Sequence, residues 1–376
     1  MEPEISIRDW VALSLVKGVG RRSAALLLEK FGTPGNCFDA SERALLSAGV
    51  KRETIEELKR GEPRSRADRE LDELKRMGAS VLALGAHSYP ALLRETYDPP
   101  IVLYCLGDPA RAFAQPCVAI VGSRHCSTYG RNVAGMLGRE LGERGVTIVS
   151  GLARGIDTAA HRGAIESGGI TIAVMGTGLD LVYPKENRKL SEEIARHGAI
   201  MSEFPLGTPP LPQNFPFRNR VISGVTLGVL VVEGAERSGS LITARMAYEQ
   251  GRDVFAVPGN ITSSKSFGPN YLIKDGARLV QSWRDVVDEF PSEIKSSILA
   301  REGPEQLSLG INPDEFMLSE LERELLGSLK PDEPVHIDQL ILSIGPSPGE
   351  LMSALLKLEM MERIKQLPGK SFVLKV

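Results

Sequence analysis

The sequence predicts an α/β fold: a doubly wound, mostly parallel sheet, preceded by a small helical domain and followed by a second small domain. Three observations predict the sheet. Between residues 117 and 290, short apolar runs alternate with amphipathic stretches of helical spacing. The runs are apolar throughout, as expected for strands that helices cover on both faces. Aromatic residues are only 5% of the chain while glycines number 38, which suits many tight strand-to-helix turns.

Residues 1–80 are expected to form the small helical domain. Leu13 and Val16 precede the glycine-containing turn 17–20, and Leu27 and Phe31 follow it at helical spacing. A helix, a Gly-x-Gly turn and a second helix form the helix-hairpin-helix pattern, whose turn can offer backbone N–H groups to a nucleic-acid phosphate. A helical packing module with a glycine turn explains the same residues equally well, so both interpretations stay open.

Residues 81–290 are expected to form the sheet domain. Two strand-like runs, 81–84 and 101–107, lead into it. Six further apolar runs are its expected strands: 118–121, 147–149, 170–174, 199–201, 227–232 and 254–257. The clearest helices are expected at 131–144, 157–167 and 241–250. Because strands that alternate with helices connect through right-handed crossovers, the sheet is expected to be parallel.

The last domain is expected at residues 313–376, after a polar linker at 291–312. Three leucine-patterned helices are followed by two strands, 363–366 and 372–376, around a Pro-Gly turn, which is the winged-helix arrangement. Residues 291–376 carry 9 Lys and Arg against 14 Asp and Glu. A winged helix that reads DNA needs a basic face, so this domain is expected to dock proteins or to pack.

The composition excludes several classes of protein. A net charge of −3 gives no overall attraction to nucleic acid, so any attraction has to be local. The four cysteines form no Cys-x-x-Cys pair and the five histidines have no metal-ligand spacing, which favours buried thiols in a reducing compartment and no bound metal. No apolar run approaches the ~18 residues of a membrane span, and the start lacks a signal-peptide pattern, so a cytoplasmic protein is expected.

Open α/β sheets bind ligands beyond the carboxyl ends of their strands. Five consecutive loops at that edge carry glycine, hydroxyl or guanidinium groups, and glycines let backbone N–H groups approach an anion. The six cations among these residues are expected to share one cleft. The candidate binding residues are Gly122, Ser123, Arg124, Gly151, Arg154, Lys185, Phe215, Arg218, Asn219, Arg220, Arg237 and Ser238.

The residues of each loop, taken alone, are also explained by an ordinary tight turn or helix cap. Binding is favoured only because all five loops lie on the same edge of the sheet. In the stretch 215–220, an aromatic residue beside two arginines suits a base stacked over a backbone held by charge. A mononucleotide, a dinucleotide and a nucleic-acid strand stay open, although the dinucleotide fingerprint and the P-loop motif are both absent. The pattern places no Ser or Cys, His and carboxylate set on this edge, so binding without catalysis and without a cofactor is expected.

Six motifs follow one another through the sheet domain: VGSR at 121–124, SGLARGIDTAAHRGA at 150–164, GTGLD and YPKEN within 176–187, FPFRNRVISG at 215–224, EGAERSGSLITA at 233–244 and FAVPGN at 255–260. In sequence and in order they resemble the DNA processing protein A family, also called DprA or Smf. The lead-in 87–108 is similar to the same family. The stretches PVHIDQL at 334–340 and QLPGKSFV at 366–373 resemble its C-terminal winged-helix-like domain.

The resemblance implies an extended Rossmann fold in a homodimeric protein that binds single-stranded DNA. Such a protein protects incoming strands and loads the RecA recombinase on them during natural transformation, without being an enzyme. By motif, the implied DNA pocket falls on Gly122, Ser123, Arg124, Lys185, Phe215, Arg218, Asn219 and Arg220. The implied dimer and RecA contacts fall within 244–253 and 270–279, with Tyr248, Asp253, Tyr271, Ile273 and Leu279 as candidates.

Two alternatives are weighed against this interpretation. A Rossmann-fold enzyme acting on small nucleotides, similar to the cytokinin-activating phosphoribohydrolases, would also bind phosphate at this edge. The PGGxGTxxE hallmark of that family is absent, and the nearest match, SGSLITA at 238–244, lacks its acidic residue. A transcription regulator that uses the winged helix is disfavoured by the acidic balance of residues 291–376.

Overall fold

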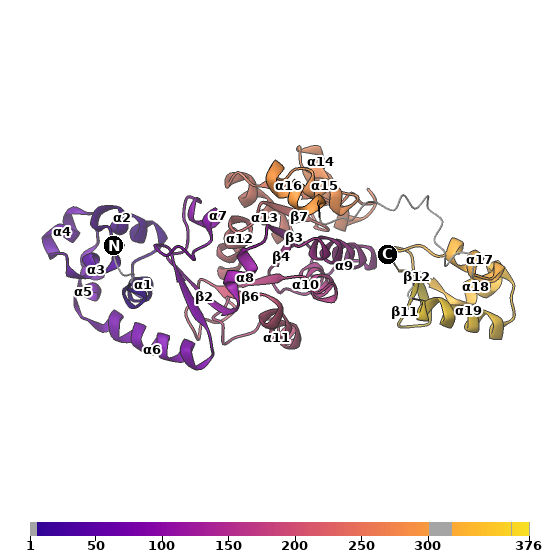
Figure 1. The fold of residues 1–376 in the computed structure, drawn as a ribbon, viewed down its shortest axis with the longest axis horizontal. Helices are drawn as coiled ribbons and strands as arrows, with labels where there is room; N and C mark the ends of the chain where they lie inside the picture. Colours follow the sequence, from indigo (N-terminus) through magenta and orange to yellow (C-terminus); the bar gives the residue numbers. More distant parts are fainter. Residues whose placement is uncertain (1–5, 301–317, 362, 376) are drawn as a thin grey trace.

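The computed structural model describes residues 6–300, 318–361 and 363–375. At its centre is a nine-stranded sheet in the order β1-β2-β6-β5-β4-β3-β7-β8-β9 (Figure 1). β2 pairs antiparallel with β1 and β6, and all other neighbouring strands are parallel, which confirms the mostly parallel sheet. The strands are β1 (Ser80–Ala83), β2 (Val102–Gly107), β3 (Cys117–Val121), β4 (Thr147–Ser150), β5 (Thr171–Met175), β6 (Ala199–Ser202), β7 (Gly228–Val231), β8 (Asp253–Ala256) and β9 (Arg278–Leu279).

Helices cover both faces of this sheet, as the continuous apolar runs predict. α12 (Asn214–Gly224) and α13 (Gly239–Glu249) pack against one set of strand residues, including Ala119 and Val121. α9 (Thr128–Glu143) and α10 (Ile156–Glu166) pack against the alternate set, including Val118 and Ile120. The other helical segments of this part are α7 (Ala91–Arg94), α8 (Pro109–Phe113), η1 (Lys185–Asn187), α11 (Arg188–His197), η2 (Ser264–Ser266), α14 (Phe267–Lys274) and α15 (Trp283–Val287).

The strand order reverses between β3 and β7. From β3 the chain builds β4, β5 and β6 outward on one side, and it then returns to place β7, β8 and β9 on the other side. The loops that leave β3 and β7 therefore diverge in opposite directions. In doubly wound sheets such a reversal opens a crevice beyond the carboxyl ends of the strands, and ligands bind there.

The N-terminal helices pack against the β1–β2 edge of the sheet. Trp10 and Leu13 share one apolar cluster with Val102 and Tyr104 of β2. The glycine turn after the first helix lines a small cavity beside Val102, so it faces the sheet edge, which favours its interpretation as a packing module. The helices are α1 (Ile7–Ser14), α2 (Arg21–Phe31), α3 (Pro34–Asp39), α4 (Glu42–Ser47), α5 (Arg52–Lys59) and α6 (Glu62–Arg76).

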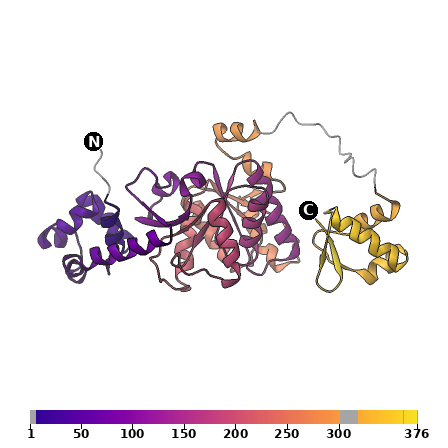
Figure 2. The same ribbon diagram turned by 60° about the horizontal axis from the view of Figure 1, so that its bottom comes forward.

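The C-terminal domain lies at the opposite end of the sheet domain from these helices (Figures 1 and 2). It combines three helices with a three-stranded sheet in the order β10-β12-β11, which confirms the winged-helix arrangement and adds one short strand to the predicted hairpin. Its elements are α17 (Glu320–Ser328), β10 (Val335–His336), α18 (Ile337–Ile344), α19 (Pro348–Met360), β11 (Ile364–Leu367) and β12 (Ser371–Leu374).

The segment expected to be a linker, 291–312, contains a helix in its described part. α16 (Ser292–Leu299) buries Ile298 in the same cluster as α9 and α15, and Ile294 and Leu299 pack against that cluster. The segment is mostly polar, so its few apolar residues do not produce a recognisable helical pattern in the sequence. Residues 301–312 of the expected linker lie outside the described part of the chain.

Three findings bear on the expectations drawn from composition. All four cysteines are free thiols, and Cys37, Cys105 and Cys117 are buried, as expected, whereas Cys126 is half-buried. Within the described ranges, no helix is long and apolar enough to cross a membrane. In those ranges, no three His, Cys, Asp or Glu residues lie together as metal ligands.

Buried His161 should make the stability of the fold depend on pH. The Thr171 hydroxyl donates to the Ile148 carbonyl, so it accepts from His161 Nδ1 at 2.7 Å, and no described donor reaches His161 Nε2. Burial lowers the pKa of His161 to about 3. Because the unfolded chain takes up this proton near pH 6.5 and the folded chain does not, stability is lost as the pH falls.

We expect the free energy of unfolding to fall by about 1.4 kcal/mol per pH unit through this group, between about pH 6 and about pH 4. Denaturant unfolding of the parent chain and of His161→Gln across this range measures the difference in slope. His197→Gln, at the half-buried end of α11, is the matched control. Identical pH dependence in the parent chain and His161→Gln would contradict the assignment.

Candidate functional site

The loops after β3 and β7, together with the start of α12, enclose a cleft of about 580 Å³. The cleft lies where the strand order reverses, which is the position expected for a ligand of this fold. Seven of the twelve candidate binding residues line it: Gly122, Ser123, Arg124, Phe215, Arg218, Asn219 and Ser238. Gly151 and Arg154 line a smaller cavity of about 130 Å³ that shares Arg124, Phe215 and Arg218 with the cleft.

The half-buried ring of Phe215 lines this cleft. The guanidinium carbons of Arg124 and Arg218 lie 5.1 Å and 5.9 Å from its centroid. The exposed ring of Tyr183 lies 5.9 Å from it, centroid to centroid, at an interplanar angle of 47°. Two aromatic faces and an exposed guanidinium thus meet at one place, which suits a planar base next to an anionic group.

Arg218 forms the buried floor of the cleft. Its Nη1 donates to the Val174 carbonyl at 2.8 Å. Burial lowers the pKa of Arg218 to about 10, and the nearby Asp157 carboxylate partly offsets this effect. The same burial raises the pKa of the Asp157 carboxyl, and Arg218 in turn opposes that rise. A Cβ at Gly151 would overlap the Arg218 guanidinium, so the loop after β4 needs glycine at this position.

Three backbone amides of the glycine loops are already hydrogen-bonded within the chain. The Ser123 amide donates to the Glu233 carbonyl at 2.8 Å, and the Gly234 amide donates to the Lys265 carbonyl at 2.8 Å. The Gly151 amide donates to the Asp157 carboxylate at 3.1 Å. The sequence-based expectation that backbone amides of these loops cradle an anion is therefore wrong for these three donors.

Arg220 does not face the cleft. Its side chain is only 5% exposed and pairs with Glu203, and its Nη1 donates to the Asp98 carbonyl at 2.6 Å. Two positions along a helix differ by about 200° in direction, so Arg218 and Arg220 cannot face the same side of α12. The expectation that both arginines of the stretch 215–220 share the cleft is wrong for this reason.

The remaining three cations, Arg154, Lys185 and Arg237, do not line the cleft, so the six predicted cations do not all share it. Arg154 is exposed and forms an ion pair with Glu186. Lys185 is exposed at the start of η1, two residues after Tyr183, and Arg237 is exposed next to Ser238. Tyr183 is a cleft residue that was not among the candidates, although its position in the motif YPKEN, beside Lys185, was a usable signal.

The candidate contact residues of the latter part of the sheet domain lie around the β9 edge of the sheet. Tyr248, Tyr271 and Leu279 are 43%, 52% and 43% exposed, and Asp253 is also exposed. Ile273 is only half-buried and packs against the sheet core. The ring of Phe267, 46% exposed, stacks on Tyr271 at 6.3 Å between centroids, so the apolar face is larger than the sequence indicates.

The doubly wound sheet, with a cationic and aromatic cleft where its strand order reverses, defines a Rossmann-like protein. Residues 80–291 match the DNA recombination-mediator protein A family, and residues 312–370 match the DprA winged helix domain. The chain belongs to this family, which confirms the resemblance that its motifs carry.

Three relatives illustrate the similarity. The chain is 39% identical to Protein Smf of Escherichia coli over 82% of this chain and 80% of that protein. The X-ray structure of DNA processing protein A from Streptococcus pneumoniae superimposes with a TM-score of 0.65 at 36% identity, over 77% of this chain and 99% of that one. DNA processing protein A from Helicobacter pylori, whose structure concerns its single-stranded DNA binding mode, gives a TM-score of 0.51 at 32% identity, over 56% and 94%.

Proposed function

We propose that this protein binds single-stranded DNA in the cleft around Phe215 and loads the RecA recombinase on the bound strand, in recombination of DNA taken up by natural transformation. The observation that carries the proposal is the meeting of Phe215, Tyr183 and Arg124 at the site where the strand order reverses. The single-stranded DNA binding mode described for the Helicobacter pylori relative supports the same ligand.

Two kinds of contact would hold the strand. Phe215 and Tyr183 offer ring faces to bases, and base stacking on aromatic side chains tolerates any sequence. Exposed Arg124 lines the cleft, and exposed Lys185 and Arg237 follow or precede the lining residues Tyr183 and Ser238 by one or two positions, so all three can neutralise phosphates. Since stacking on Phe215 requires a base whose face is accessible, the cleft selects single strands over duplex.

The carboxylates that border the cleft support binding without catalysis. Asp157 accepts from the Gly151 and Ala153 amides, at 3.1 Å and 3.3 Å. The Glu233 carboxylate accepts from the Ser127 amide at 2.8 Å and from the Ser127 hydroxyl. Both groups hold loops and the start of α9 in place, so we assign neither as a general base.

We infer that the exposed face around Tyr248, Tyr271 and Leu279 mediates self-association and contact with RecA. These side chains, with Phe267, form an apolar area beside the outer edge of β9, and both features favour protein contacts. For a cytoplasmic homodimer we expect a mass in solution of twice the 40.8 kDa of the chain.

One electrophoretic experiment tests the proposal. The full chain is mixed with single-stranded or duplex DNA of the same sequence, with and without RecA. We expect a shift of the single strand at lower protein concentration than duplex, and faster RecA filament formation in the presence of the protein. Equal affinity for duplex would overturn the assignment of the cleft to single strands, and no effect on RecA would overturn the loading role. Release of base from nucleoside monophosphates would instead identify an enzyme.

Replacing Phe215 by alanine should weaken binding of single strands by about 1–3 kcal/mol, because the variant loses one stacking surface. The loss should be similar for strands of different sequence. Fluorescence anisotropy with labelled oligonucleotides measures it, and Phe217→Ala is the matched control, since exposed Phe217 does not line the cleft. Equal affinities of Phe215→Ala and Phe217→Ala would remove Phe215 from the binding surface.

A further inference from the structure

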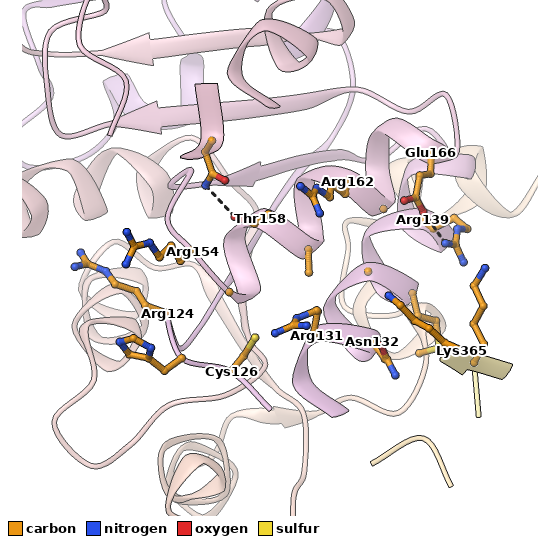
Figure 3. A pocket seen from close by; sticks show the side chains of 18 of the residues that line it. Arg124, Cys126, Arg131, Asn132, Arg139, Arg154, Thr158, Arg162, Glu166 and Lys365 are labelled. Carbon is orange, nitrogen blue, oxygen red and sulfur yellow. Dashed lines mark hydrogen bonds and ion pairs between the residues drawn. The ribbon is translucent and has the colours of Figure 1, made fainter. Parts of the chain in front are cut away.

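A second and larger depression runs from the cleft toward the C-terminal domain. It has a volume of about 900 Å³ and lies over the exposed sides of α9 and α10 (Figure 3). We call it the α9–α10 groove and define it by Arg131 and Arg139 of α9, Arg162 of α10 and Lys365 of β11. None of these four residues lines the proposed cleft.

The groove is strongly cationic. Eight Lys or Arg side chains line it, against two Glu. Glu166 is paired with Arg139 at 2.7 Å, and Glu359 accepts from the Gln366 amide at 3.1 Å, so both acids are engaged within the chain. Arg162 is exposed and has no ion pair among the described residues. The sheet domain has a near-neutral total charge, so this accumulation is local.

The groove is continuous with the cleft. Arg124 lines the cleft, the small cavity beside Phe215 and the groove, and Arg154 lines the last two. Figure 3 shows Arg124 and Arg154 at one end of the groove, Arg131 and Arg162 in its middle, and Arg139 and Lys365 at the other end. Arg131 and Arg139 are eight residues apart on α9, so the cationic path extends about 12 Å along that helix.

The C-terminal domain presents its basic part to this groove. Residues 363–375 contain Arg363, Lys365, Lys370 and Lys375 and no acidic residue. Lys365 and Lys375 line the groove, and the Pro331 carbonyl accepts from Asn132 Nδ2 of α9 at 3.4 Å. The net charge of the C-terminal domain is negative, but the part of the domain that lies next to α9 is basic.

We propose that the α9–α10 groove binds a further stretch of the sugar-phosphate backbone of the same single strand, between the cleft and the β11–β12 hairpin. This inference rests on the proposed function. No Phe, Tyr or Trp is among the described residues that line the groove, so it offers charge without stacking surfaces. Its contribution should be independent of base sequence, strongly dependent on salt, and present only for strands long enough to leave the cleft.

The test compares two lengths of oligothymidylate: the shortest that binds the parent chain, and one several times as long. The variant is Arg131→Ala with Arg162→Ala. The control is Arg111→Ala with Arg196→Ala, which removes two exposed cations at the opposite, amino edge of the sheet. We expect the groove variant to bind the long strand roughly tenfold more weakly than the control does, with a salt slope reduced by about 1.4.

Unchanged affinity for the short strand is expected in the groove variant, and it also shows that the variant is folded. Lys365→Ala should produce a smaller loss of the same kind. The assignment of the groove would be overturned if the groove variant bound the long strand as tightly as the control does. It would also be overturned if the groove variant lost the same affinity for both strand lengths. A parent chain that binds no oligothymidylate of any length would overturn the proposed function and this inference with it. An affinity of the parent chain that does not depend on strand length would overturn the inference about the groove alone.

Discussion

Removing the charges of Arg124 and Lys185 together is expected to weaken binding of single-stranded DNA by at least roughly 100-fold, since each of the two charge-assisted contacts with a phosphate contributes on the order of 1.5–3 kcal/mol. Arg124 is the stronger of the two candidates, because it lines every cavity of the site and lies 5.1 Å from the Phe215 centroid. Lys185 is exposed at the start of η1, two residues after Tyr183.

The salt dependence distinguishes lost phosphate contacts from a distorted site. Each contact with a single strand adds about 0.7 to the slope of log affinity against log salt, so the double variant should lose about 1.4. Titrations of Arg124→Ala/Lys185→Ala at several salt concentrations measure this slope. The pair Arg111→Ala/Arg196→Ala again removes two charges at the amino edge and should bind as the parent chain does. A double variant with the parent's affinity and slope would defeat the assignment of the cleft.

Arg220→Ala is expected to lower the free energy of unfolding by about 3–5 kcal/mol, as is found when one partner of a buried ion pair is removed. The Arg220 and Glu203 side chains are 5% and 10% exposed and in contact. The Nε of Arg220 also lies 3.7 Å from Asp98 Oδ2. Without the guanidinium, the buried Glu203 carboxylate loses this positive charge.

Denaturant unfolding of Arg220→Ala measures the loss, with Arg237→Ala as control because Arg237 is exposed and its removal should change stability by less than about 0.5 kcal/mol. At a temperature where Arg220→Ala remains folded, we expect it to bind single strands nearly as the parent does. A variant of normal stability that had lost its affinity for DNA would show that Arg220 contacts the strand after all.

Much of the fold was accessible from the sequence, because a strand buried on both faces has to be apolar at every position. The six apolar runs from Val118 to Val257 correspond to β3 through β8. The alternation of apolar runs with helices also predicted that the cationic loops lie on one edge of the sheet, because parallel strands all end at the same edge. The helix α16 was missed because its apolar residues, Ile294, Ile298 and Leu299, are few and stand among polar ones.

At the site, the sequence predicts neither the direction in which a side chain points nor its hydrogen-bond and ion-pair partners. Arg218 and Arg220 stand two positions apart in one motif, and only the helical phase of α12 separates the cleft floor from a buried ion pair. The Asp157 carboxylate accepts from the Gly151 amide across a turn. The Glu233 carboxylate accepts from the Ser127 amide, which is far away in the sequence. Sequence spacing alone does not predict either contact. The sequence did not predict the α9–α10 groove, because the net charge of a segment is the sum over its basic and acidic faces.

The engagement of the loop amides by the chain's own acceptors has a consequence for selectivity inside a cell. A free mononucleotide brings one phosphate and one base, and the Ser123, Gly151 and Gly234 amides are already engaged, so these three donors do not compensate for its loss of hydration. A polymer engages rings and cations at many points at once, so successive weak contacts multiply. Such a surface discriminates by length, and it would remain available to long strands even amid abundant metabolic nucleotides.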